Sequence, residues 1–127
     1  MVWCGVGTKT YISVSYIQDI RDQSWNEVDD FLDAVGAAIK VQIRTAGDGL
    51  IPGGMIQYQN TDLMMISQNA NNHQQTFGVL RESITALLEY MRAQKKYGYS
   101  PSFVEFNTYD GPNQVANATF RPKTSSW

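Results

Sequence analysis

The chain has 127 residues, of which 43% are hydrophobic and 17% charged, and its formal net charge is -2 at pH 7. This composition fits one globular domain and excludes the polar, highly charged class of disordered chains. The acidic balance provides no basic face for nucleic acid, and no apolar run reaches the roughly 20 residues of a membrane span, so neither nucleic-acid binding nor a membrane span is expected.

The N-terminal part of the chain predicts a strand followed by a helix. Residues 11–17 alternate β-branched or aromatic side chains with smaller polar ones, which is typical of a strand. Ser24 and Glu27 have the spacing of a capping box, in which each side chain bonds the backbone amide of the other residue. Apolar residues then recur at intervals of three and four, so we expect a helix over residues 24–45.

The rest of the chain predicts a hairpin, a second helix and a second hairpin. Residues 55–59 and 63–67 are short apolar runs around an Asn-Thr-Asp turn. An apolar stripe at helical spacing predicts a helix over residues 76–96. Residues 102–109 and 114–120 are β-branched and aromatic runs on either side of an Asp-Gly-Pro-Asn turn, which predicts the second hairpin.

These elements indicate the α+β class. Each helix has one apolar stripe that must be buried, so we expect both helices to pack on one face of a shared antiparallel sheet. The order of strand, helix, hairpin, helix and hairpin is close to the split β-α-β, or ferredoxin-like, arrangement with an extra strand. We therefore expect residues 1–127 to form a single domain, with residues 1–10 and 121–127 as flexible arms.

Two segments in the C-terminal half carry a resemblance to a known group of proteins. Residues 76–91, which begin Thr-Phe-Gly-Val-Leu and end Tyr-Met, and residues 109–115, Tyr-Asp-Gly-Pro-Asn-Gln-Val, resemble small secreted proteins of filamentous fungi. The resemblance covers about the last third of the chain. The activities of these proteins are mostly unassigned and no catalytic residue carries over, so the resemblance implies an extracellular, effector- or toxin-like binding role; a cytoplasmic protein is the alternative.

An acidic cluster near the start of the first predicted helix has two interpretations. Asp29, Asp30 and Asp33 have D-D-x-x-D spacing, which resembles the metal-binding motif of terpene cyclases. Those enzymes are large and all-helical, whereas acidic residues in the first turns of a helix are stabilised by its dipole. We therefore interpret the cluster as a solvated acidic face and expect neither a metal nor a cofactor.

The polar segment before the second predicted helix is the first place to look for a ligand site. His73 is the only histidine. The sequence identifies no nucleophile or orienting group for it, so the alternative to a ligand-binding role is an exposed loop histidine without a function. The amides around it lie near a helix N-terminus, which favours anions. In a dimeric barrel, Tyr58 and Asn107 would be the polar groups of an apolar pocket. The candidate ligand-binding residues are Asn71, Asn72, His73, Gln74, Tyr58 and Asn107.

Other residues bear on assembly and modification. Trp25, Met64 and Ile66 are candidate interface residues. Trp25 follows the helix cap and is expected to be only partly covered, whereas Met64 and Ile66 belong to a continuous apolar strand that needs cover on both faces. Cys4 is the only cysteine, so it either packs as a small hydrophobic residue or forms a disulfide between two chains. Asn117 begins an Asn-Ala-Thr acceptor for N-glycosylation, which would be used if the chain is secreted.

Two hypotheses of function follow from the sequence. Because no group of residues has a catalytic pattern, the first is a secreted, non-enzymatic binding or interaction protein that acts as a homodimer on a protein or small-molecule ligand. The second is a small enzyme or ligand carrier of the dimeric α+β barrel type, with an apolar pocket near His73.

Overall fold

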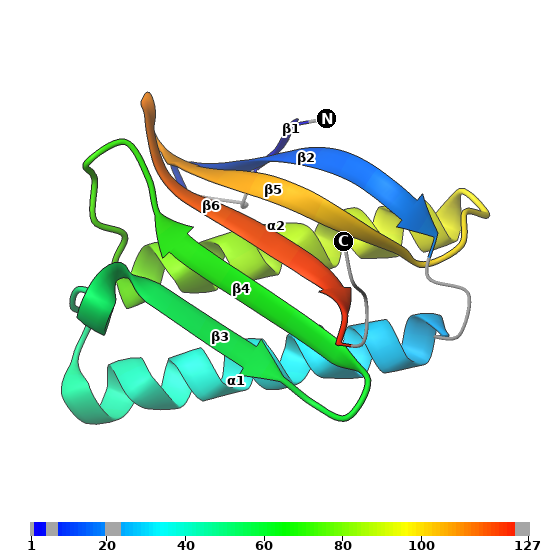
Figure 1. Cartoon of the computed structure of the whole chain (residues 1–127), viewed down its shortest axis with the longest axis horizontal. Coiled ribbons are helices and arrows are strands. Elements are labelled where there is room, and N and C mark those ends of the chain that lie inside the picture. Colours follow the sequence, from blue (N-terminus) through cyan, green and yellow to red (C-terminus); the bar gives the residue numbers. More distant parts are fainter. Residues whose placement is uncertain (1, 5–7, 20–23, 124–127) are drawn as a thin grey trace.

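The computed structural model describes residues 2–4, 8–19 and 24–123, and the structural statements below concern these residues. Within them the chain forms two α-helices, a short 3-10 helix and an antiparallel sheet of six strands, which is an α+β architecture (Figure 1). In chain order the elements are β1 (Val2–Cys4), β2 (Thr10–Asp19), α1 (Trp25–Ala46), η1 (Pro52–Gly54), β3 (Met55–Gln59), β4 (Leu63–Asn69), α2 (Phe77–Lys96), β5 (Ser102–Asp110) and β6 (Asn113–Pro122). Both predicted helices and both predicted hairpins are confirmed.

Helix α1 begins and ends at the signals that the sequence carries. Ser24 Oγ accepts a hydrogen bond from the Glu27 backbone N–H at 3.2 Å, and the Glu27 carboxylate accepts one from the Ser24 N–H at 3.2 Å. This reciprocal pair is the predicted capping box. At the other end Gly47 has a φ of 81°, which favours glycine, and its N–H donates to Ile43 O at 2.8 Å.

The sheet has the strand order β1-β2-β5-β6-β4-β3, and every neighbouring pair is antiparallel. Strand β6 lies between β4 and β5, the two strands that α2 connects. This order does not confirm the ferredoxin-like arrangement expected from the order of elements. Turn residues determine which strands form hairpins, but the pairing of β6 with β4 depends on long-range packing that no local pattern reports.

The two predicted arms contain more structure than expected. Val2–Cys4 forms β1, which pairs with residues 11–13 of β2, and β2 already begins at Thr10. At the other end β6 extends to Pro122, while residues 124–127 lie outside the described part of the chain. Strand β1 is only three residues long, so it has too little sequence to show a period of two.

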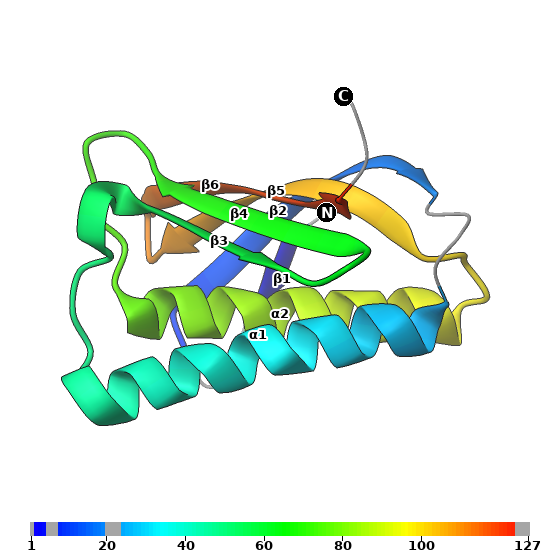
Figure 2. The ribbon, with the colours of Figure 1, turned by 60° about the horizontal axis from the view of Figure 1, so that its bottom comes forward.

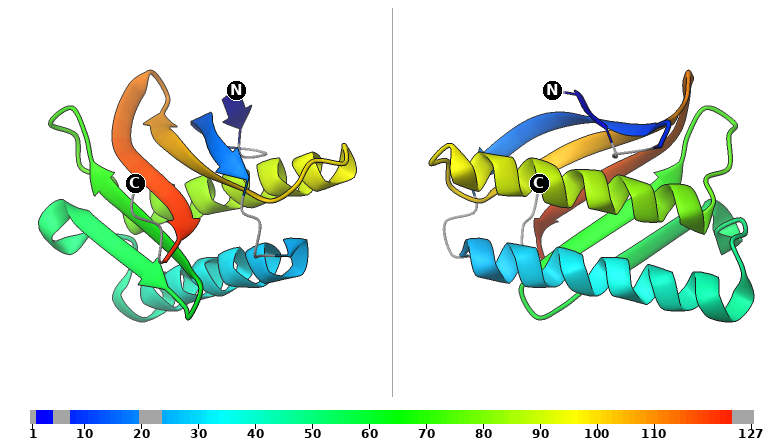
Figure 3. Two further views of the ribbon diagram at one scale, coloured as in Figure 1. Left: turned by 45° about the vertical axis from the view of Figure 1, so that its right-hand side comes forward. Right: turned by 180° about the vertical axis from the view of Figure 1, so that it is seen from behind.

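Both helices lie side by side under one face of the sheet, as the apolar stripes predicted (Figures 2 and 3). The core forms between the two layers. Alternate strand residues such as Ile12, Met65 and Phe106 are almost completely buried there, as are Leu32 and Leu87 from the helices. Neither described helix has the length and hydropathy needed to cross a bilayer.

The first turn of α2 is held by two side chains. Thr76 Oγ1 accepts from the Val79 N–H at 3.2 Å, and Asp48 Oδ1 accepts from the Gly78 N–H at 2.8 Å. The Asp48 carboxylate therefore occupies the position at which a helix N-terminus binds an anion. A Cβ on Gly78 would collide with this carboxylate, so only glycine allows Asp48 to come so close.

Substitution of Gly78 tests this contact. We expect Gly78→Ala to lower the free energy of unfolding by about 1 kcal/mol, although alanine has the higher helix propensity, because the Asp48 carboxylate is displaced. In an Asp48→Ala background there is no collision, and the same substitution should stabilise the protein by about 0.5–1 kcal/mol. Urea unfolding of the four proteins measures both values. Equal effects of Gly78→Ala in the two backgrounds would contradict the contact.

Candidate functional site

The face of the sheet opposite the helices, here called the open face, is not covered by any described helix (Figure 2). Side chains alternate between the two faces of a strand. Phe106 and Ala118 are buried on the helix side, so Asn107 and Asn117 lie on the open face, where they are directly paired across β5 and β6. The open face is therefore formed by the polar half of these two strands.

A hollow of about 490 Å³ lies on the open face. Strands β5 and β6 curve strongly across this part of the sheet (Figure 3). The hollow spans β4, β5 and β6, and three of its lining side chains are amides. Its lining residues are Ile66, Gln68, Glu105, Asn107, Asn117, Ala118, Thr119 and Arg121.

A chain of hydrogen-bonded amides runs from the loop after β4 into this hollow. Asn71 Nδ2 donates to Gln114 Oε1 at 3.3 Å, and Gln114 Nε2 donates to Asn117 Oδ1 at 2.6 Å. The bonds orient these side chains relative to one another. The Nδ2 of Asn117 remains as a donor with no partner among the described residues, so it is available to a ligand.

Several other polar side chains of the hollow have no internal partner. The side chains of Gln68, Glu105, Asn107 and Thr119 form no hydrogen bond or ion pair with any described residue. Together they offer both donors and acceptors on one surface. A ligand with matching groups can therefore bind without first breaking contacts within the protein.

An aromatic pair borders the open face beside these amides. Tyr11 of β2 and Tyr109 of β5 are directly paired and stack with their ring centroids 4.7 Å apart and their planes 1° from parallel. Tyr109 also pairs with Gln114, the middle residue of the amide chain. The open face thus combines hydrogen-bonding groups with a stacked pair of aromatic rings.

The structure brings together some of the predicted ligand residues and separates others. Asn107 lines the hollow of the open face, and Asn71 is linked to the hollow by the amide chain. Asn72 and Gln74 lie exposed in the loop before α2, and His73 is exposed there with its N–H bonded to Ala70 O at 3.0 Å. Tyr58 lies on the helix side of β3. His73, Tyr58 and Asn107 therefore do not surround one pocket.

Burial of the Tyr58 and Tyr90 side chains on the helix side of the sheet has a chemical consequence. Burial raises the pKa of both phenols above 10.0. Tyr90 of α2 is 6% exposed and makes an edge contact with Trp3, with the ring centroids 6.1 Å apart. Both rings therefore pack in the helix layer as neutral phenols and take no part in the open face.

The raised pKa of Tyr90 predicts a loss of stability in alkali. Below about pH 10 the phenol is neutral in the folded and unfolded states, so its contribution is complete. Above that pH it ionises first in the unfolded state, and stability falls until the pH passes the folded pKa, by at most about 1.4 kcal/mol per pH unit. Tyr90→Phe should lose less stability than the native chain between pH 8 and about 11 in urea unfolding. Equal losses in the two proteins would refute the assignment.

The predicted interface residues are distributed over both layers. Met64 and Ile66 lie on the open face of β4, where Met64 is 8% exposed and Ile66 lines the hollow. Trp25 is half-buried, and its Nε1 donates to Tyr99 O at 3.0 Å, so it fastens the start of α1 to the loop before β5. Cys4 is exposed at the end of β1.

The acidic cluster of α1 serves the contact between the helices. Arg92 of α2 donates to both carboxylate oxygens of Asp29, at 3.0 and 3.4 Å, and its Nη2 lies 3.8 Å from Asp33 Oδ2. The hydrogen bond to Asp29 raises the pKa of Arg92. The i, i+4 spacing that resembles a metal motif therefore positions two carboxylates for one arginine. Among the described residues, no group of three or more histidine, cysteine, aspartate or glutamate side chains gathers as metal ligands would.

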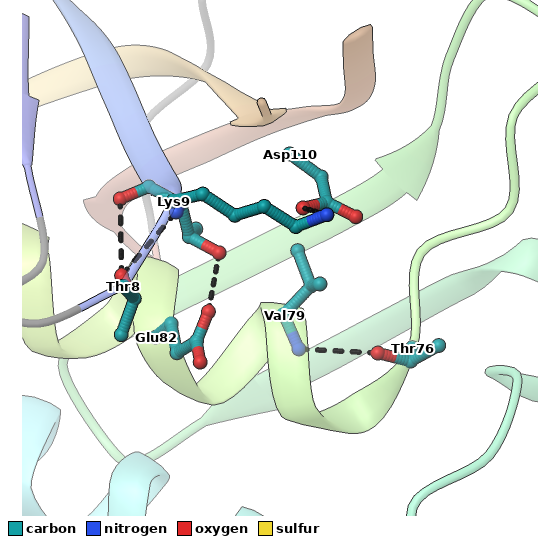
Figure 4. Close-up of polar contacts among 7 residues, drawn as sticks. Thr8, Lys9, Thr76, Val79, Glu82 and Asp110 are labelled. Atoms are coloured by element: carbon teal, nitrogen blue, oxygen red, sulfur yellow. Dashed lines mark hydrogen bonds and ion pairs between the residues drawn. The ribbon is translucent and has the colours of Figure 1, made fainter. Parts of the chain in front are cut away.

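A second hollow, of about 420 Å³, lies on the helix side next to Asp48 and Glu82. Its acidic groups already have partners within the chain. Asp48 caps α2. Glu82 accepts a hydrogen bond from the buried hydroxyl of Thr10, next to the Lys9–Asp110 ion pair at 3.6 Å (Figure 4). The Thr10–Glu82 hydrogen bond and the Lys9–Asp110 ion pair connect the start of β2 to α2 and β5, so we assign them a structural role.

The sequence contained a signal for the open face that periodicity alone could have revealed. Glu105, Asn107 and Tyr109 alternate along β5, as Asn117, Thr119 and Arg121 do along β6. If the two segments are neighbouring strands, these residues predict one continuous polar surface.

Asn117 and Thr119 share this face, so a glycan on Asn117 would fill the hollow, and glycosylation and ligand binding would exclude each other.

Comparisons with known proteins found no counterpart. No family model matches the chain, no curated protein matches it, and no solved structure matches its fold.

Proposed function

We propose that the chain is a small, secreted, non-enzymatic binding protein of the effector or toxin kind, which acts as a homodimer and binds its ligand on the open face. The observation that carries the proposal is the hollow across β4, β5 and β6, with its hydrogen-bonded amide chain and the unpartnered side chains of Gln68, Glu105, Asn107 and Thr119. Secretion is supported by the resemblance of residues 76–91 and 109–115 to small secreted proteins of filamentous fungi.

The chemistry of the hollow favours a neutral ligand rich in hydroxyl groups, and we infer a short oligosaccharide. Amides donate and accept at once, as sugar hydroxyls do, and Glu105 and Arg121 supply one charge of each sign. The nearby Tyr11–Tyr109 pair offers an apolar ring surface for the C–H face of a sugar. An ionic ligand would instead need an excess of one charge.

Calorimetric titration with neutral hexose and N-acetylhexosamine oligomers tests this function. We expect saturable binding by at least one oligomer and no new product when the mixture is chromatographed after prolonged incubation. Release of shorter sugars would favour the alternative of a small enzyme. Absence of binding across the panel would refute the ligand class.

A further inference from the structure

Strand β3 is the outermost strand at one edge of the sheet, and it lacks the features that normally protect such an edge. Among the described strands it pairs only with β4, in an unbroken register from Met55 to Gln59. Its sequence, Met-Ile-Gln-Tyr-Gln, contains neither a charge nor a proline. Soluble proteins block outer strands with charges, prolines or bulges, because unpaired backbone groups there bind another strand.

The register shows which backbone groups of β3 point outward. At the turn, Asn60 N–H donates to Leu63 O at 3.0 Å, so these two residues are a hydrogen-bonded pair. Pairs alternate along an antiparallel ladder, which makes Ile56 and Tyr58 the residues that bond β4. The N–H and C=O groups of the intervening residues therefore point away from the sheet. These residues are Met55, Gln57 and Gln59.

An apolar groove of about 250 Å³ lies directly below this edge, between β3 and α1. Phe31, Ala34 and Val35 of α1 and Tyr58 of β3 line it, with Asp30 at its rim. An added strand would therefore meet backbone groups at the edge and an apolar surface on the helix side.

We propose that the second copy of the chain in the homodimer pairs its own β3 antiparallel with this one, across a two-fold axis at Gln57. This register matches outward groups with outward groups: Gln57 faces Gln57 of the second copy, and Met55 faces its Gln59. Each of these pairs exchanges two backbone hydrogen bonds.

The side chains of β3 fit the same two-fold register. On the helix side, Ile56 lies opposite Tyr58 of the second copy, a β-branched and aromatic pair that stabilises antiparallel strands. Since β3 has no charge, the two paired strands bring no like charges together. Stacking of two open faces would instead bury the Glu105 carboxylate among the amides of the hollow, which is unfavourable for a charge without a matched partner.

This assembly rests on the homodimer proposed above and adds a consequence for binding. The two sheets become one continuous sheet, so both hollows lie on the same side of it. A ligand with repeated units, such as an oligosaccharide chain, can then contact both hollows at once, which raises its apparent affinity without any new contact.

Two substitutions at Gln57 test the edge. Gln57→Pro removes an outward N–H while leaving the ladder to β4 intact, and Gln57→Lys places two positive charges against each other at the axis. We expect each to raise the dimer dissociation constant about tenfold or more in size-exclusion chromatography with light scattering. Ser15→Lys is the control. It adds the same charge on β2, near the opposite edge of the sheet from β3, and should leave the dimer dissociation constant unchanged. Circular dichroism confirms that each variant is folded.

The outcomes separate the edge from the dimer itself. A native chain that stays monomeric at high concentration would refute the homodimer and the edge together. If the native chain is a dimer and both Gln57 variants keep the native dissociation constant, pairing through β3 is refuted but the homodimer is not. Hydrogen exchange provides a second test. The backbone N–H of Gln57 should be protected in the dimer and lose that protection on dilution. Fast exchange of this N–H in a dimeric sample would also refute pairing through β3.

Discussion

Phe106→Ala is expected to lower the free energy of unfolding by about 3–5 kcal/mol. Phe106 is 1% exposed in the middle of β5 and lies between Val14 of β2 and Ala118 of β6 on the face that the helices cover. Truncation would open a cavity where sheet and helices meet. A loss of this size is a large part of the roughly 5–15 kcal/mol that stabilises a domain of this kind.

The neighbouring residue provides the matched control. Asn107 follows Phe106 on the same strand but lies on the open face, so Asn107→Ala should change the unfolding free energy by only about 0.5 kcal/mol. Urea unfolding followed by circular dichroism gives both values. Similar losses for the two variants would mean that both faces of β5 are buried, and the open face would not exist.

The second large effect concerns ligand affinity. Asn107→Ala combined with Asn117→Ala should weaken binding of an oligosaccharide by about 10–100-fold, because two directly paired amides of the hollow lose their hydrogen bonds to the ligand. Calorimetric titration measures the change. Gln42→Ala, an exposed amide on α1, is the control and should bind like the native chain.

Two outcomes of this comparison would argue against the open face as the binding surface. Native affinity in the double variant would place the ligand elsewhere. Equal weakening by Gln42→Ala would indicate a general effect on the fold. Because neither asparagine of the double variant is in the core, loss of binding with an unchanged unfolding midpoint would locate the effect at the surface.

Local chemistry explains why so much of the fold could be predicted from the sequence. The Ser24–Glu27 capping box and the apolar stripes place both helices, and turn residues such as Asn60 place the hairpins, because each signal depends on residues close in the chain. The Asn60 side chain, for example, accepts from the Asp62 and Leu63 amides at 2.9 and 2.7 Å.

The remaining features depend on residues that are distant in the sequence. The pairing of β6 with β4, the cap that Asp48 gives to Gly78, and the bond of Arg92 to Asp29 each join residues from different elements. No spacing rule reports such contacts. For the same reason the candidate site was predicted only in part: Asn71 and Asn107 belong to it, whereas its other members become neighbours only when β4, β5 and β6 pair.

The proposed function depends most on recognition of the ligand by the open face of the sheet. Titration of the isotope-labelled protein with the tightest-binding neutral oligosaccharide, followed by amide chemical shifts, tests this claim most directly. We expect shifts concentrated at residues 105–107 and 117–119 and at the side-chain amides of Asn107, Asn117 and Gln68. Shifts confined to the helices or to His73 and its loop would contradict it.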